Sequence, residues 1–148
     1  MKGENTMFHF YAMLSRMKYI CRWGLMRNTR SETLSEHSFE TAVIAHALAV
    51  LRNTRFVSPE RAALLALYHD AAEIITGDLP TPVKYFNPKI RSAYREVETV
   101  AQEKLLSLLP DDLKPSYESI FTAAQEGDRE LLPLVKAADK LSAIIKCM

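Results

Sequence analysis

The apolar residues of this 148-residue chain recur at helical spacing, and this periodicity is the strongest constraint on its fold. The segment from Ala42 to Leu51 is apolar nearly all round, as in a central, buried helix. The long segments lack the strict apolar and polar alternation of a half-buried strand, and only four glycines occur in the chain. The pattern therefore predicts an all-α fold.

Capping residues and helix breakers place the predicted helices. Ser58, Pro59 and Glu60 are the clearest start signal, because they supply a cap, a first-turn proline and an acid at the positive end of the helix dipole. We expect an ordered, proline-rich loop over residues 79–88 with one helical turn at Val83 to Phe86. The predicted helices run from Met7 to about Cys21, from Ser35 to Arg52, from Pro59 to about Ile75, from Pro88 to Leu109, within Pro115 to Gln125, and from Asp128 to the C-terminus.

Composition and charge narrow the class of protein. Hydrophobic residues make up 48% and charged residues 25% of the chain, which predicts one globular domain over residues 1–148. Nineteen basic residues against eighteen acidic ones leave a net charge of +1, which disfavours a polymeric nucleic acid as partner but allows a small anion. Cys21 and Cys147 stand far apart, which indicates free thiols in a reducing compartment. With no signal segment and no apolar run of about 20 residues, we expect a cytoplasmic protein without a membrane span.

Two histidines and two acids form a candidate metal site. His37, the adjacent pair His69-Asp70 and the distant Asp139 all lie in predicted helices, and facing helices of a bundle commonly build such sites. A lone histidine in a helix is more often a hydrogen-bonded core residue, but an adjacent His-Asp pair in an apolar helix is hard to explain by packing. His46 lies nine residues beyond His37, so it points to the opposite helix face and is interpreted as structural. Two imidazoles and two carboxylates suit one divalent first-row ion such as cobalt or manganese, with positions left open for catalysis.

Five motifs contain or surround these residues, namely Arg22-Trp23, residues 35–38, residues 68–73, residues 76–86 and residues 135–139. They resemble the motifs of the HD-domain metal-dependent phosphohydrolases, and among them the bacterial 5′-deoxynucleotidases. The resemblance runs from the first predicted helix to the last residue, and it implies a helical bundle with the metal site between central helices. Relatives with two metals carry further histidines after the His-Asp pair, and residues 71–138 contain none, so a single metal is expected.

Further site residues follow partly from spacing and partly from the resemblance. Glu73 lies three and four residues after Asp70 and His69, on the same helix face, where it can orient the attacking water or relay a proton. The alternative interpretation is that Glu73 is a solvated glutamate near a helix end. The resemblance adds Asp78 as a second acid near the leaving oxygen and makes Arg22 a phosphate ligand, so the predicted catalytic residues are Glu73, Asp78 and Arg22. The predicted substrate-binding residues are Arg22, Trp23, His37, Asp70, Asp78, Leu79, Pro80, Thr81 and Asp139.

The Arg22-Trp23 pair carries little information by itself, because a single tryptophan is usually core and an arginine usually surface. In the similar deoxynucleotidases the arginine orients the phosphate and the tryptophan lies near the sugar carbon that bears a 2′-hydroxyl in ribose. An apolar wall there would disfavour ribose. Three other cations, Arg27, Arg30 and Lys84, can add positive potential or be ordinary surface residues.

The leading hypothesis is a metal-dependent phosphomonoesterase that hydrolyses 2′-deoxyribonucleoside 5′-monophosphates, with a small nucleotide as its partner. One alternative is an HD hydrolase of another nucleotide or small phosphomonoester. Another is a non-catalytic nucleotide-sensing module, against which the intact Glu73 and Asp78 argue.

The last predicted helix carries an apolar stripe that points to self-association. Similar deoxynucleotidases continue with further helical sequence, so we expect that this chain lacks a C-terminal helical extension and that part of the stripe is exposed. Exposed apolar surface usually marks an interface, and a twofold homodimer is the commonest solution. The stripe consists of Ala137, Leu141, Ile144, Ile145 and Met148.

Overall fold

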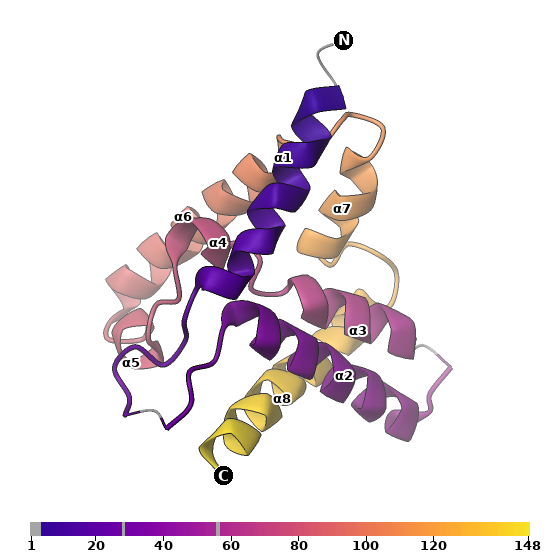
Figure 1. Ribbon diagram of the computed structural model, residues 1–148. Coiled ribbons are helices and arrows are strands. Elements are labelled where there is room, and N and C mark those ends of the chain that lie inside the picture. The colour runs from indigo at the N-terminus through magenta and orange to yellow at the C-terminus, as the bar shows by residue number, and fades with distance from the viewer. Residues whose placement is uncertain (1–3, 28, 56) are drawn as a thin grey trace. The chain divides into compact units, whose positions relative to one another are not determined.

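The computed structural model describes residues 4–27, 29–55 and 57–148, and for residues 4–7 only the backbone. Regular structure in these residues is helical, apart from one isolated antiparallel bridge between Cys21 and Thr33. The prediction of an all-α fold is therefore confirmed. Figure 1 shows the helices, which are α1 (Glu4–Leu14), the 3-10 helix η1 (Ser15–Tyr19), α2 (Leu34–Arg52), α3 (Pro59–Tyr68), α4 (Glu73–Thr76), α5 (Thr81–Lys84), α6 (Pro88–Leu106), α7 (Lys114–Phe121) and α8 (Asp128–Cys147).

The chain forms two compact units, each built from two separate stretches of sequence. Unit 1 comprises Met1–Leu34 and Asp70–Pro115, and unit 2 comprises Ser35–His69 and Ser116–Met148. Each is described by itself below, and the single domain over residues 1–148 stays a prediction. No helix in the described part of the chain is long and apolar enough to cross a membrane.

Unit 1 is organised around α6, which packs against α1, α4 and α5. Asn87 and Pro88 begin α6: the Asn87 side chain accepts a hydrogen bond from the Ile90 amide at 2.9 Å, and Pro88 occupies the first turn. A small apolar cluster beside η1 contains Met17, Leu34 and Ile74. The helix ends at Leu106, three residues before the predicted end.

Unit 2 is held together by the packing of α3 against α8, seen in Figure 1. Its core consists mainly of alanine, valine and leucine side chains from α2, α3 and α8, among them Ala45, Ala66 and Ala138. Such small residues let helices approach closely. The start of α3 agrees with the prediction, since the Ser58 hydroxyl accepts a hydrogen bond from the Arg61 amide at 3.1 Å and Pro59 lies in the first turn.

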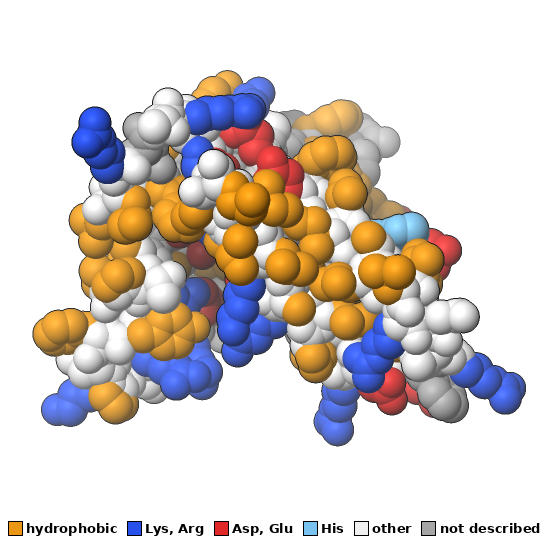
Figure 2. Space-filling model, turned by 90° about the horizontal axis from the view of Figure 1, so that it is seen from below, with side chains coloured by type: hydrophobic (Ala, Val, Ile, Leu, Met, Phe, Trp, Pro, Cys, Tyr) orange, Lys and Arg blue, Asp and Glu red, His pale blue; other side chains and the backbone are white. Residues whose placement is uncertain are grey.

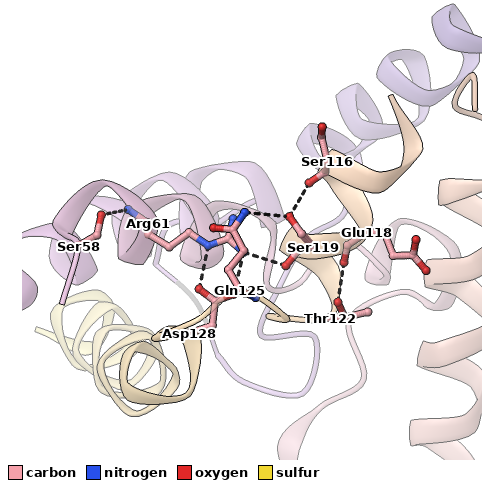
Figure 3. Close-up of polar contacts among 8 residues, drawn as sticks. All are labelled: Ser58, Arg61, Ser116, Glu118, Ser119, Thr122, Gln125 and Asp128. Atoms are coloured by element: carbon pink, nitrogen blue, oxygen red, sulfur yellow. Dashed lines mark hydrogen bonds and ion pairs between the residues drawn. The ribbon is translucent and has the colours of Figure 1, made fainter. Parts of the chain in front are cut away.

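A buried ion pair ties the start of α3 to the start of α8 (Figure 3). Asp128 is fully buried, and Arg61 donates to both of its oxygens, at 2.9 Å and 2.7 Å. Arg61 also donates to the Ser119 carbonyl at 2.8 Å, and the Gln125 amide donates to Asp128 at 2.9 Å. These contacts lower the pKa of Asp128, chiefly through the hydrogen bonds from Arg61. The bidentate geometry satisfies both charges inside the protein.

The predicted first helix is interrupted. Helix α1 ends at Leu14, and residues 15–19 tighten into η1 instead of continuing to Cys21. The Ser15 hydroxyl donates to the Ala12 carbonyl at 2.8 Å, a side-chain bond that competes with the regular helical ladder. The predicted turn at Val83–Phe86 also lies earlier, as α5 over residues 81–84, where Pro82 fits the first helical turn.

Helix α2 was predicted to be apolar and buried all round, and this is wrong for one side of it. Beyond Leu34 at its start, the buried positions form a stripe of small or polar residues, and large apolar side chains such as Phe39, Val43 and Leu51 are exposed. The stripe recurs at helical spacing and consists of His37, Ser38, Thr41, Ala45 and Ala49.

Candidate metal and nucleotide site

The predicted third helix ends just before His69, one of the predicted metal ligands. Helix α3 ends at Tyr68, residues 69–72 form a turn, and α4 begins at Glu73. The His69 ring nitrogen Nδ1 lies 2.6 Å from the Ala66 carbonyl oxygen. In a continuous α-helix that oxygen would accept from the Asp70 amide, so the imidazole competes for it. The backbone then continues with i→i+3 bonds, including Glu73 N–H to the Asp70 carbonyl at 2.9 Å.

The same hydrogen bond prepares His69 to bind a metal. A carbonyl oxygen can only accept, so Nδ1 carries the ring proton and Nε2 keeps its lone pair. Metal-binding histidines are commonly oriented in this way by a backbone carbonyl. The ring of His37 lies beside that of His69, with ring centroids 5.4 Å apart.

His37 and Asp139 bring α2 and α8 to the same place in unit 2. His37 is fully buried, and its Nε2 lies 3.1 Å from Asp139 Oδ1. Two ligands bound to one ion at about 2.1 Å and roughly at right angles lie about 3 Å apart, so this spacing fits adjacent positions around a metal. Asp70 follows His69 directly in the chain, and the ligand atoms of His37, His69 and Asp70 lie within 4.8 Å of one another. The donor set therefore fits a divalent ion.

In unit 1, Glu73 is a buried carboxyl that favours its protonated form. Burial raises the pKa of Glu73 to about 8, and the negative charges of Asp70 and Asp78 add to this effect. Its Oε2 is buried and has no hydrogen-bond partner among the described residues. Sequence spacing placed Glu73 near Asp70 in a continuous helix; the structure retains that proximity through a tighter turn. A carboxyl of this kind can hold a proton at neutral pH and release it to a developing alkoxide.

Arg22 lies in the loop that connects η1 to α2, and its guanidinium is largely buried. The Arg22 amide donates to the Glu32 carbonyl at 2.9 Å, and Leu34 N–H to the Ile20 carbonyl at 2.8 Å, which closes this loop. Arg22 Nε lies 3.7 Å from Glu32 Oε2, too long for a hydrogen bond. Nε and Nη1 are buried without a hydrogen-bond partner in the described part of the chain. Unsatisfied guanidinium N–H groups are suited to an anion such as phosphate.

Trp23 has a backbone conformation that its residue type rarely adopts. Its φ is +67°, in the left-handed region, and its indole Nε1 donates to Glu32 Oε2 at 2.7 Å. The side chain is half-buried rather than enclosed in the core. One buried carboxylate therefore accepts from Trp23 and lies beside Arg22. Glu32 was not among the predicted site residues, because a glutamate in a polar loop carries no distinctive signal.

The loop from Gly77 to Lys84 is tied to α6. Lys84 Nζ lies 2.7 Å from Glu98 Oε1 and 4.5 Å from the centre of the Tyr94 ring. The Tyr94 hydroxyl donates to the Gly77 carbonyl at 3.4 Å. Of the predicted substrate-binding residues in this loop, Asp78, Leu79 and Pro80 are half-buried and Thr81 is exposed.

The other polar candidates differ in exposure. Arg27 and Arg30 are exposed, whereas Lys84 is half-buried and close enough to Glu73 to lower that residue's pKa. His46, which the sequence interpretation treats as structural, is exposed. The candidate residues thus form two groups: His37, His69 and Asp139 in unit 2, and Asp70, Glu73, Asp78, Arg22 and Trp23 in unit 1. The peptide bond between His69 and Asp70 links the two groups covalently.

Comparison with known proteins agrees with this chemistry. Residues 9–148 match the family model described as "5′-deoxynucleotidase YfbR-like". The chain is 50% identical over 143 residues to a 5′-deoxynucleotidase of Erwinia tasmaniensis, covering 95% of this chain and 72% of that protein. It is 52% identical over 145 residues to a 5′-deoxynucleotidase of Photorhabdus temperata, covering 96% of this chain and 73% of that protein.

Solved structures show the same fold. An HD-domain phosphohydrolase of Listeria innocua matches with a TM-score of 0.75 at 23% identity, over 94% of this chain and 67% of that one. The HD phosphohydrolase DatZ of cyanophage S-2L, bound to dA and one catalytic Zn²⁺ ion, matches with a TM-score of 0.60 at 24% identity, over 90% and 67% of the two chains. The predicted HD-domain bundle is therefore confirmed, while the individual site residues stay predictions.

The raised pKa of Glu73 makes a testable prediction about stability. A carboxyl whose folded pKa lies near 8, above its ordinary value of 4.5, contributes stability that is fully present below about pH 4.5 and is lost as the pH rises through 8. Removing the ionisable group by Glu73→Gln should therefore raise the free energy of unfolding, relative to the original chain, more at pH 8.5 than at pH 5. Urea unfolding with a chelator present measures both values.

The control for this experiment is Glu96→Gln on α6, which removes an exposed carboxylate. It should change the free energy of unfolding by the same amount at both pH values. If the stability difference between Glu73→Gln and the original chain were the same at pH 5 and pH 8.5, Glu73 would not hold a proton in the folded state.

Proposed function

Because the chain belongs to the YfbR-like family of 5′-deoxynucleotidases, we propose that it hydrolyses 2′-deoxyribonucleoside 5′-monophosphates to deoxynucleoside and phosphate. The observation that carries the proposal beyond family membership is the Arg22 guanidinium, buried in unit 1 with two N–H-bearing nitrogens unsatisfied. A buried donor without an acceptor is unfavourable, typically by about 1–3 kcal/mol, so such a group favours a ligand that supplies acceptors. A nucleotide phosphate supplies several acceptor oxygens.

We propose His37, His69, Asp70 and Asp139 as the ligands of one divalent first-row ion, such as cobalt or manganese. The 3.1 Å separation of His37 Nε2 and Asp139 Oδ1, and the closeness of His37, His69 and Asp70, support this set. A divalent cation held there supplies positive charge that polarises the phosphate and favours a deprotonated water. Through the bound phosphate, His37, Asp70 and Asp139 also become part of the substrate site.

Glu73 is proposed as the proton donor. Attack of water on phosphorus forms one P–O bond and breaks the bond to the 5′-oxygen, which leaves as an alkoxide and needs a proton. The proton lost by the water passes to solvent, from which the proton donor is restored after each turnover. Glu73 holds a proton at neutral pH because its carboxyl is buried and lies near Asp70 and Asp78. Asp78 thus acts partly through its charge on Glu73. With Leu79, Pro80 and Thr81 it belongs to the loop that α6 holds in place, which we propose contacts the nucleoside.

Trp23 is proposed to select deoxyribose. Its indole is half-buried, and its Nε1 donates a hydrogen bond to Glu32, which orients the flat apolar face of the ring. A 2′-hydroxyl placed against that face would lose its hydrogen bonds to water, at a cost of about 1–3 kcal/mol, or about 10- to 100-fold in kcat/KM.

The activity is tested by measuring phosphate release from matched deoxyribo- and ribonucleoside 5′-monophosphates with added Co²⁺ or Mn²⁺. We expect turnover of the deoxyribonucleotides. Arg22→Ala should lower kcat/KM by about 10²-fold for all monophosphates, because charge-assisted hydrogen bonds to the phosphate are lost. Arg27→Ala, which removes an exposed arginine from the same loop, is the control and should change little. Absence of phosphate release with every metal would refute the proposed activity.

A second prediction concerns the sugar. Replacing Trp23 with Gly removes the ring and relieves the left-handed backbone, so the preference for deoxyribonucleotides over ribonucleotides should shrink towards unity. Trp23→Phe keeps an apolar ring but loses the hydrogen bond to Glu32, and should retain most of the preference. The measurement is the ratio of kcat/KM for a deoxyribonucleotide to kcat/KM for the matching ribonucleotide. If Trp23→Gly left this ratio unchanged, the indole would serve packing and not sugar selection.

We also propose that two copies of the chain associate through the exposed apolar surface of α2 and α8. Hydrophobic side chains gather over these helices in Figure 2, in agreement with the exposure of Phe39 and Val43 on α2, of Ile144 and Ile145 on α8, and of Met148 just after α8. Two exposed free thiols, Cys21 and Cys147, suit the reducing cytoplasm we propose as its location, which cell fractionation can check.

The dimer is tested by sedimentation of the chain at micromolar concentration. We expect a dimer for the original sequence and a monomer for Ile144→Glu, since burying a carboxylate in an apolar interface is unfavourable. Val97→Glu, at a similarly exposed position on α6, is the control and should remain dimeric. A monomeric original chain would contradict the proposal.

A further inference from the structure

The second ring nitrogen of His37 has a buried partner on another helix. His37 Nδ1 lies 3.2 Å from the Ser142 hydroxyl oxygen, and both side chains are fully buried. Ser142 lies one helical turn after Asp139 on α8. The two residues of α8 therefore approach opposite sides of one imidazole, with Asp139 at Nε2 and Ser142 at Nδ1.

A serine hydroxyl alone does not determine which nitrogen carries the proton, because it can donate or accept. Here Ser142 Oγ donates to Glu40 Oε2 at 3.3 Å. An ionised carboxylate can only accept, so the Ser142 hydrogen is directed to Glu40 and an oxygen lone pair is left facing His37. Nδ1 must then be an N–H donor, and in the neutral imidazole Nε2 keeps its lone pair on the side of Asp139.

We infer that Glu40 and Ser142 are positioning residues that hold His37 in the tautomer required for a metal ligand. The inference rests on the metal site of the proposed function. The opposite side of the ring supports it: Thr41 Oγ1 lies 3.4 Å from Nε2 and can donate to that lone pair. With Nε2 unprotonated, two electron-rich atoms, Nε2 and Asp139 Oδ1, lie 3.1 Å apart, an arrangement that a shared cation stabilises.

The two histidines are thus held in the same tautomer by different means. His69 donates to the backbone carbonyl of Ala66, which no substitution removes, whereas His37 depends on two side chains. Glu40 is exposed, so its replacement leaves the core intact. Partners of this kind commonly contribute 10- to 100-fold to metal affinity.

The test measures the dissociation constant for Co²⁺ by calorimetry on the full chain. Ser142→Ala should raise it by about 10- to 100-fold, with far-UV circular dichroism and thermal unfolding showing that the chain is folded. Ser38→Ala is the matched control: Ser38 follows His37 directly and is equally buried, but its hydroxyl has no hydrogen-bond partner among the described residues. Ser38→Ala should leave the dissociation constant unchanged.

A double-mutant cycle distinguishes the effect of Glu40 through its hydrogen bond with Ser142 from a direct effect of its negative charge on the metal site. Glu40→Ala should weaken Co²⁺ binding several-fold, because the freed hydroxyl can then donate to Nδ1. If Glu40 acts through Ser142, the double variant should bind no more weakly than Ser142→Ala. Equal affinity of Ser142→Ala and the original chain, or additive effects of the two substitutions, would overturn the inference.

The nitrogen-15 chemical shifts of the His37 ring in the metal-free chain give a readout independent of catalysis. Nδ1 should be protonated in the original chain, and Glu40→Ala should give a mixture of tautomers; an unprotonated Nδ1 in the original chain would refute the inference directly. If the original chain bound no Co²⁺ or Mn²⁺ at all, the proposed metal site would fail, whereas the tautomer measurement would still decide the roles of Glu40 and Ser142.

Discussion

Several features of the candidate site depend on the contact of the His69 imidazole with the Ala66 carbonyl. It takes an acceptor that a continuous helix needs, and so accompanies the end of α3 and the turn that leads to α4. It also fixes the protonated nitrogen of one metal-ligand candidate. The turn carries Asp70 and the start of the segment that buries Glu73. One side-chain-to-backbone contact therefore sets a helix boundary and a tautomer together, and the position of two carboxyls depends on the turn that follows it.

Buried polar groups among the described residues differ in whether other protein groups satisfy them. Arg61 and Asp128 satisfy each other completely, with two hydrogen bonds between them and further bonds to the backbone. Arg22 and Glu73 are also buried, yet each keeps polar atoms without a partner among the described residues. Desolvated groups left unsatisfied are unfavourable for folding, and they are retained where a ligand completes them.

Local signals in the sequence predicted the helices, because periodicity, caps and prolines act over a few residues. Ser58-Pro59 and Asn87-Pro88 begin their helices as expected. The break after Tyr68 was missed because it depends on a histidine side chain reaching its own backbone. His37, His69, Asp70 and Asp139 were identifiable because such residues are rare in apolar helices. Ser142, a common residue type, lies 105 positions from His37 and had no such signal.

Glu32 has a consequence for how this site can change during evolution. Its carboxylate accepts from the Trp23 indole and lies beside the Arg22 guanidinium, and its backbone carbonyl holds the Arg22 amide. The groups proposed to bind phosphate and to discriminate the sugar therefore share one support. A substitution that moves this carboxylate alters both properties at once. A lineage drifting towards ribonucleotides would more readily change the indole itself than its anchor.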